Sequence, residues 1–204
     1  MVTENIEKAL KALFGDEPTQ QLARILLHLS RTGVVSYDEA RRTANGDPDD
    51  ALISAFALRL LVPLRSVKGT LAWDDGVFLL RPGERYKMPN VVRYLVDEAV
   101  TTGDWNPPKA IGQVLGDMGE PQWRRMPDIV NRLGEEASAN IIDADTVRRV
   151  CRESGLGKQV DSLIAALKGA GVMSPRLGAM GEVHRAGSPL YELNPSLFPT
   201  PQKS

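Results

Sequence analysis

The sequence predicts a mainly helical α+β protein with small β-hairpins, in which one arrangement of elements occurs twice. Each copy has three amphipathic helices followed by two strand-like runs around a glycine-containing tip, from about residue 20 to 80 and again from about 126 to 198. A length of 204 residues suits two small domains, and an apolar fraction of 42% supports packed cores. We therefore expect an N-terminal domain over residues 1–88, a helix and linker over 89–125, and a C-terminal domain over 126–204.

The N-terminal domain shows helical spacing of apolar residues and recognisable caps. The helices are expected over residues 4–14, 20–32, 37–44 and 49–61. Ser36, three residues before Glu39, forms a capping-box pattern that should start the 37–44 helix. A short extended piece at 34–35 comes before it, and strands are expected over residues 64–72 and 77–80. Asp74-Asp75-Gly76 between these strands is typical of a hairpin turn, and Trp73 should cover the core of that hairpin.

The rest of the chain is interpreted in the same way. Helices are expected over residues 88–100, 126–137, 144–154 and 158–169, with one or two helical turns within 111–115. An extended piece at 140–142 and strands over 172–177 and 190–193 complete the second copy, with its tip over 178–187. Asp143 should cap the 144–154 helix, and Gly171 should stop the 158–169 helix. Residues 101–108 are rich in helix breakers and are the expected linker.

Composition argues against several classes of function. Cys151 is the single cysteine, so no intrachain disulfide is expected, and His28 and His184 lack the cysteine partners of a zinc site. The sequence shows neither a signal peptide nor the roughly 20 apolar residues that span a bilayer, so we expect a soluble cytoplasmic protein without a membrane partner. It also lacks a phosphate-binding glycine loop with its lysine and any nucleophile signature, so we expect no enzyme and no cofactor.

The C-terminal copy resembles a known family in the succession of its segments. A helical run at 146–150 is followed by Ser-Gly-Leu-Gly at 154–157, a second helical run at 160–167, Gly-Ala-Gly-Val at 169–172 and a return strand before Asn-Pro at 190–195. This succession resembles a winged-helix transcription regulator, where a helix, a tight turn, a recognition helix and a glycine lead into a β-hairpin wing. The resemblance implies two tandem winged helix-turn-helix domains. It implies the fold more strongly than the function.

The third helix of the C-terminal copy is the expected DNA reader. Its apolar residues fall within a sector of about 100°: Val160, Leu163, Ile164 and Leu167. The opposite face carries small and polar residues that would let the helix approach base edges: Lys158, Gln159, Ser162, Ala165 and Ala166. The candidate DNA-binding residues are Arg148, Arg149 and Arg152 on the preceding helix, Lys158, Gln159 and Ser162, and Arg176, His184 and Arg185 in the wing.

The charge balance limits the expected affinity for DNA. The whole chain has a formal charge of −1, so any DNA-binding charge must be local. From residue 140 to 190, seven Lys and Arg face five Asp and Glu, a surplus of two positive charges. One such domain would bind weakly, and a dimer would be needed for useful affinity.

The third helix of the N-terminal copy differs in chemistry. Asp47, Asp49 and Asp50 at its start would repel phosphates. Its other positions are apolar nearly all round, which is typical of a helix covered on more than one side. The alternatives are packing within the chain, for example against the 88–100 helix, and a dimer or partner interface. The candidate interface residues are Ile53, Ala57, Leu58 and Leu61.

Two hypotheses of function follow from the sequence. In the first, the protein is a transcription regulator that binds double-stranded DNA through its C-terminal copy, and the N-terminal copy forms the surface for a homodimer or a protein partner. In the second, the protein is a tandem winged-helix adaptor within a larger complex, without direct DNA contact.

Overall fold

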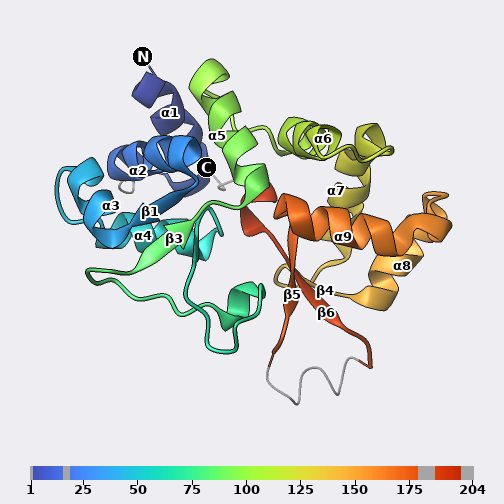
Figure 1. Cartoon of the computed structure of the whole chain (residues 1–204). Helices are drawn as coiled ribbons and strands as arrows, with labels where there is room; N and C mark the ends of the chain where they lie inside the picture. The colour runs from blue at the N-terminus through green and yellow to red at the C-terminus, as the bar shows by residue number, and fades with distance from the viewer. Residues whose placement is uncertain (1, 16–18, 179–186, 199–204) are drawn as a thin grey trace.

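The computed structural model describes residues 2–15, 19–178 and 187–198, and over these the protein is mainly helical with two small antiparallel sheets (Figure 1). The predicted α+β class is confirmed at this level. The helices are α1 (Val2–Phe14), α2 (Thr19–Thr32), α3 (Tyr37–Ala44), α4 (Asp49–Ala57), α5 (Asn90–Thr102), α6 (Pro107–Asp117), α7 (Met126–Glu136), α8 (Ala144–Glu153) and α9 (Val160–Ala170). The strands are β1 (Val34–Ser36), β2 (Val62–Pro63), β3 (Arg85–Lys87), β4 (Ile141–Asp143), β5 (Met173–Arg176) and β6 (Leu190–Leu193).

The same order of elements occurs twice. The N-terminal copy runs α2-β1-α3-α4-β2-β3, and the C-terminal copy runs α7-β4-α8-α9-β5-β6. In each copy the last strand lies in the middle of a three-stranded sheet, ordered β1-β3-β2 and β4-β6-β5. The registers correspond as well, since Val35 pairs with Tyr86 in one sheet and Ile142 pairs with Tyr191 in the other. Figure 1 shows β5 and β6 projecting from the helical body as a two-stranded ribbon.

The predicted helix caps are confirmed. Ser36 Oγ accepts a hydrogen bond from Glu39 N at 3.2 Å, and Glu39 Oε2 accepts one from Ser36 N at 2.8 Å, which completes the capping box. Asp143 Oδ1 accepts from Thr146 N at 2.9 Å at the start of α8. Gly171 ends α9 in the left-handed conformation, with φ of 75°.

The predicted strands over residues 64–72 and 77–80 are wrong, because the described structure joins these segments by an isolated antiparallel bridge between Ser66 and Gly76 and not by a ladder. The strands of the first sheet are β2, which has only two residues, and β3, which comes later than expected. Asp74 and Asp75 lie in a short 3-10 turn instead of a hairpin tip. Asp75 is buried, and its carboxylate accepts hydrogen bonds from Lys68 N at 3.0 Å and from Thr70 N and Oγ1 at 3.0 and 2.9 Å. Burial alone would raise the pKa of Asp75, but these hydrogen bonds outweigh burial and lower it.

Helix α4 ends at Ala57, four residues earlier than predicted. Arg59 adopts a left-handed conformation with φ of 52°, which turns the chain away from the helix axis. The helix packs on α2, and its Phe56 ring stacks on Phe78 with centroids 4.3 Å apart. Intrachain packing, mainly against α2, therefore covers part of this helix.

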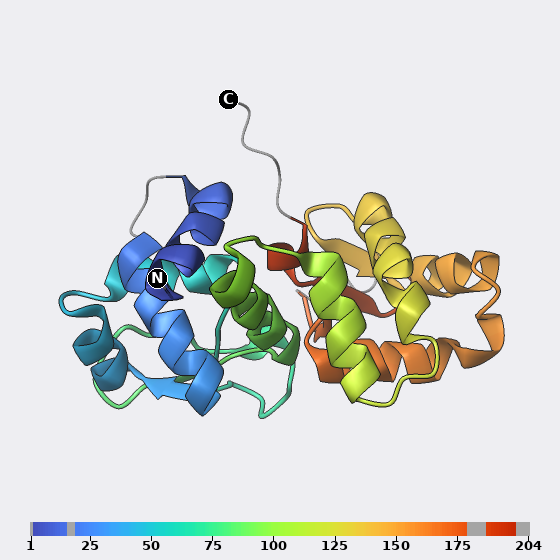
Figure 2. The same ribbon diagram turned by 90° about the horizontal axis from the view of Figure 1, so that it is seen from above.

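A continuous apolar core joins the two copies. Helix α5 packs against α1 and α2, α6 packs against α7 and α9, and α5 and α6 pack against each other. Figure 2 shows α5 and α6 side by side between the N-terminal and C-terminal copies. Helix α6 is longer than predicted, because Asn106 Oδ1 accepts from Lys109 N at 3.1 Å and prolines occupy its first turn.

Polar contacts also connect the copies. Arg59 Nε lies 2.8 Å from Glu192 Oε1, and both side chains are mostly buried. Asn194 is fully buried, and its Nδ2 donates to Arg59 O at 3.3 Å and to Gly171 O at 3.2 Å. At the far end of α5, Trp105 Nε1 donates to Ser196 O at 2.9 Å.

The turn at residues 73–75 reaches into the C-terminal copy. Trp73 N donates to Ser174 Oγ on β5 at 3.0 Å. The buried Trp73 borders Pro63 and Leu64 of its own copy as well as Met173 and Pro175 of the other. Asp74 Oδ2 accepts from Leu177 N and Gly178 N, both at 2.9 Å. The N-terminal copy thereby contacts both β5 and the residues that directly follow it. Over the described residues, no helix is long and apolar enough to cross a membrane.

Candidate nucleic-acid interface

Helix α9 has the two faces that its sequence predicts. Its buried face is formed by Val160, Leu163, Ile164 and Leu167. The opposite face is open: Lys158, Gln159, Ser162 and Ala165 are exposed, and Ala166 is half-buried. The side chains that can approach another molecule here are therefore short or polar.

The turn before α9 is built around one apolar anchor. Leu156 is buried, and its amide donates to Cys151 O at 2.8 Å, so the chain folds back tightly after α8. Gly155 supplies a left-handed conformation with φ of 73°. Lys158 and Gln159 follow in a 3-10 turn, and Ser162 Oγ donates to Gln159 O at 2.8 Å. Cys151 is buried in the core, and this burial raises the pKa of its thiol.

The arginines of α8 differ in their environments. Arg148 pairs with Asp145 at 3.0 Å on its own helix. Arg149 pairs with Glu136 of α7 at 3.0 Å and with Glu153 at 3.3 Å, and these carboxylates raise the pKa of its guanidinium. Arg149 thus contacts both α7 and its own helix.

Arg152 lies closest to the α8–α9 turn. It makes no ion pair with any residue that the structure describes. A Cβ atom placed on Gly157 would lie 3.4 Å from Arg152 Cγ, so the stem of this arginine follows the turn that leads to Lys158. Arg152 and Lys158 are consequently two cations beside the start of α9.

The structure adds two charged residues that the sequence analysis did not select. Asp161 and Lys168 are exposed on α9, on the same side as Ala165. Residues three or four positions apart share one helix face. The spacing of Asp161, Ala165 and Lys168 therefore predicts that these three residues lie on the same side of α9.

Of the predicted wing residues, the described part of the ribbon contains Arg176. Arg176 on β5 is half-buried, and it borders a surface hollow of about 630 Å³ with Lys168, Leu177 and Tyr191. His184 and Arg185, the other predicted wing residues, lie outside the described residues. Within the part of the chain that the structure describes, no three His, Cys, Asp or Glu side chains group closely enough to hold a metal ion.

The predicted partner residues on the N-terminal copy do not form one surface. Ile53 is 48% exposed, Ala57 is exposed and Leu58 is half-buried. Leu61 is fully buried, so its inclusion in an interface was wrong: the chain turns inward after α4 and places this side chain in the core. The largest exposures of apolar side chains are instead at Val67 and Leu71, with 75% and 82% exposed.

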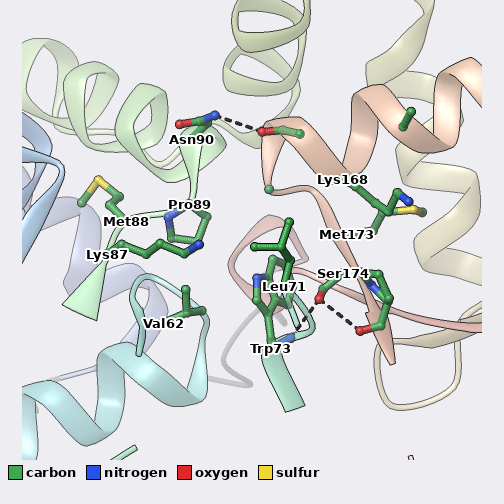
Figure 3. A pocket seen from close by; sticks show the side chains of 14 residues that line it. Val62, Leu71, Trp73, Lys87, Met88, Pro89, Asn90, Lys168, Met173 and Ser174 are labelled. Atoms are coloured by element: carbon green, nitrogen blue, oxygen red, sulfur yellow. Dashed lines mark hydrogen bonds between the residues drawn. The ribbon is translucent and has the colours of Figure 1, made fainter. Parts of the chain in front are cut away.

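A cleft of about 470 Å³ lies between the two copies, beside the C-terminal half of α9 (Figure 3). One wall comes from the N-terminal copy with Leu71, Trp73 and Lys87, and the other comes from α9 and β5 with Lys168 and Met173. None of these residues was selected from the sequence as a site. Their convergence depends on the packing of the two copies, which local patterns do not contain.

A protein-family model matches residues 4–201, which is almost the whole chain, and the chain therefore belongs to that family. The description of this family states no activity, ligand or partner. No curated protein matches the sequence.

Proposed function

We propose that this member of the family is a tandem winged-helix protein that binds double-stranded DNA as a transcription regulator, with its C-terminal copy as the reader. The repeated order of helices and strands supports the two winged helices, because each copy places three helices before a strand pair whose last member is central. In the C-terminal copy, α8, the turn at Gly155 and α9 form the helix-turn-helix, and β5 and β6 form the wing.

The observation that carries this proposal is the open face of α9. Lys158, Gln159 and Ser162 lie at the start of the helix, where a helix-turn-helix contacts base edges, and all three are exposed. Ala165 follows on the open side, and its small side chain would let the helix enter the major groove deeply. Gln159 can pair with adenine through its amide, and Lys158 with guanine or a phosphate.

The charges on this surface predict modest, salt-dependent affinity. The exposed cations of α8 and α9 and the turn between them are Arg148, Arg149, Arg152, Lys158 and Lys168, and the exposed carboxylates are Asp145, Glu153 and Asp161. Five positive and three negative charges leave a surplus of two. Binding would therefore need additional contacts, either from the wing or from a second protein molecule. In a homodimer, the N-terminal copies of the two molecules would form the contact between them. Asp161 would be tolerated best opposite a cytosine amino group.

A titration of fluorescent DNA duplexes tests the proposal. We expect binding at low salt and its loss at high salt, and we expect R152Q/K158Q to weaken it by at least about tenfold, since each neutralised phosphate contact contributes to affinity. The same variant should reduce the slope of log affinity against log salt by about two. The control is K8Q/K11Q on α1, which removes the same charge elsewhere. Equal DNA affinity of the two double variants would contradict the proposal.

The adaptor function is the second candidate, and the exposed side chains of Val67 and Leu71 favour it. Val67 and Leu71 lie four residues apart, and a protein partner that bound there would cover both apolar side chains. A co-purification from native lysate after nuclease treatment, with the full chain and with V67S/L71S, distinguishes the two functions. A stoichiometric protein that survives the nuclease and is lost with V67S/L71S would support the adaptor.

A further inference from the structure

The cleft between the two copies is held open by contacts at both of its ends. On one side, Trp73 N donates to Ser174 Oγ at 3.0 Å, and on the other, Asn90 Nδ2 donates to Gly169 O at 2.9 Å (Figure 3). Gly171 passes so close to Pro89 that a Cβ atom there would lie 2.7 Å from Pro89 Cβ. The walls are therefore fixed relative to each other before any ligand enters.

The lining of this cleft combines an apolar body with two cations. Trp73, Met88 and Met173 are buried side chains of the lining, and Leu71 stands beside them with most of its side chain exposed. Lys87 and Lys168 come from the N-terminal and C-terminal walls, respectively. No carboxylate lines the cleft, and neither lysine makes an ion pair with any described residue.

The remaining polar groups of the lining are already engaged. The Asn90 amide donates to Gly169, and the Ser174 hydroxyl accepts from Trp73 N and donates to Pro175 O at 3.1 Å. The two ammonium groups are consequently the charged donors available to a ligand. Uncompensated positive charge beside an apolar surface is complementary to an anion that carries an apolar group.

We propose that this cleft binds a small organic anion, with a flat or branched apolar body against Trp73 and Met173 and an acidic group bound by the lysines of the two walls, Lys87 and Lys168. The volume of about 470 Å³ falls in the range typical of small-molecule sites. It is too small to admit a nucleic-acid duplex, whose backbone would meet the lysines only at the rim. Ala165 and Lys168 belong to α9, so the ligand would lie next to the face proposed to read DNA, but its binding does not depend on that function.

A pair of fluorescent probes tests the site. The anionic probe is 1-anilinonaphthalene-8-sulfonate, and the neutral probe is N-phenyl-1-naphthylamine, which has the same aromatic body without the sulfonate. We expect saturable binding of one anionic probe per chain. K87Q/K168Q should weaken the anionic probe about tenfold, because hydrogen bonds to charged groups are lost, and should leave the neutral probe within about twofold. K8Q/K11Q on α1 is the charge-matched control and should change neither affinity.

A second variant tests the location independently of charge. Ala165 is exposed at the rim, so A165F should fold while its ring occupies the cleft and weakens both probes. Circular dichroism confirms folding, and the lysine variants carry the test alone if A165F does not fold.

The proposal fails if the anionic probe binds K87Q/K168Q as tightly as it binds the wild type, or if folded A165F leaves both probes unaffected. It also fails if K87Q/K168Q lowers DNA affinity without changing the affinity for either probe, since the lysines would then belong to a nucleic-acid surface.

Discussion

Substitution of Gly171 by alanine tests how closely the two copies approach. Gly171 has φ of 75°, and a Cβ atom placed on it would lie 2.7 Å from Pro89 Cβ and 3.2 Å from both Pro89 Cα and Asn90 N. Two of these three atoms are backbone, so the neighbour cannot yield by changing a rotamer. Gly155 is the matched control, because its φ is 73° and no atom lies within 4 Å of the added Cβ.

The expected magnitudes follow from this geometry. A left-handed conformation costs an alanine about 1–2 kcal/mol, and the reduced entropy of the unfolded chain returns about 0.4–1 kcal/mol. G155A should therefore lose about 1 kcal/mol of unfolding free energy. G171A carries the same cost and adds overpacking of about 1–3 kcal/mol, so it should lose about 2–4 kcal/mol.

Urea denaturation followed by circular dichroism measures both variants. With a slope of about 2 kcal/mol per molar urea, each 2 kcal/mol of lost stability lowers the midpoint by about 1 M. The midpoint of G171A should therefore lie well below that of G155A. If the two variants have the same midpoint, the backbone of α5 does not press on Gly171, and the described packing of the two copies is incorrect.

Three further predictions concern single contacts. R59M should lose about 3 kcal/mol of stability, because it leaves Glu192 buried without its ion-pair partner. In a double-mutant cycle, R59M/E192L should recover most of that loss, and additive losses of the two single variants would refute a coupled pair. S36A should cost about 1 kcal/mol by thermal denaturation, and an unchanged melting temperature would mean that the capping box does not contribute. For Asp143, burial raises the pKa but hydrogen bonds from Thr146 lower it below its ordinary value. The carboxylate therefore stabilises the fold at neutral pH, and the stability difference between wild type and D143A should be largest above about pH 4 and shrink as the pH falls through the lowered pKa; a constant difference would contradict this.

Local sequence patterns predicted most of the helices, because the interactions that start and end these helices involve residues only a few positions apart. The capping box at Ser36, the Asp143 cap and the Gly171 stop each depend on one turn of backbone, and all three are present. The buried face of α9 followed in the same way from its helical spacing. Helix α6 was predicted too short although its signal was present, since Asn106 comes directly before two prolines.

Elements that depend on the other copy could not be predicted from local patterns. Residues 64–80 have the composition of a hairpin, but Asp75 binds the loop before it and Asp74 binds Leu177 and Gly178 more than 100 residues away. Helix α4 is apolar beyond Ala57, but Arg59 turns the chain in contact with Glu192. The cleft belongs to the same class, because its two walls come from different copies and face each other only when both copies are packed.

The reach of Asp74 to the far end of β5 has a consequence for dissecting this protein. A fragment that ends after β3 would leave this carboxylate without its amide partners. A fragment that begins at α7 would leave those amides without the carboxylate, and the buried Asn194 amide would lose one of its two acceptors, Arg59 O. Neither fragment should then reproduce the behaviour of the intact chain, and heat should melt both copies together in one cooperative transition. Any activity lost on truncation would have to be assigned through point variants in the full-length molecule.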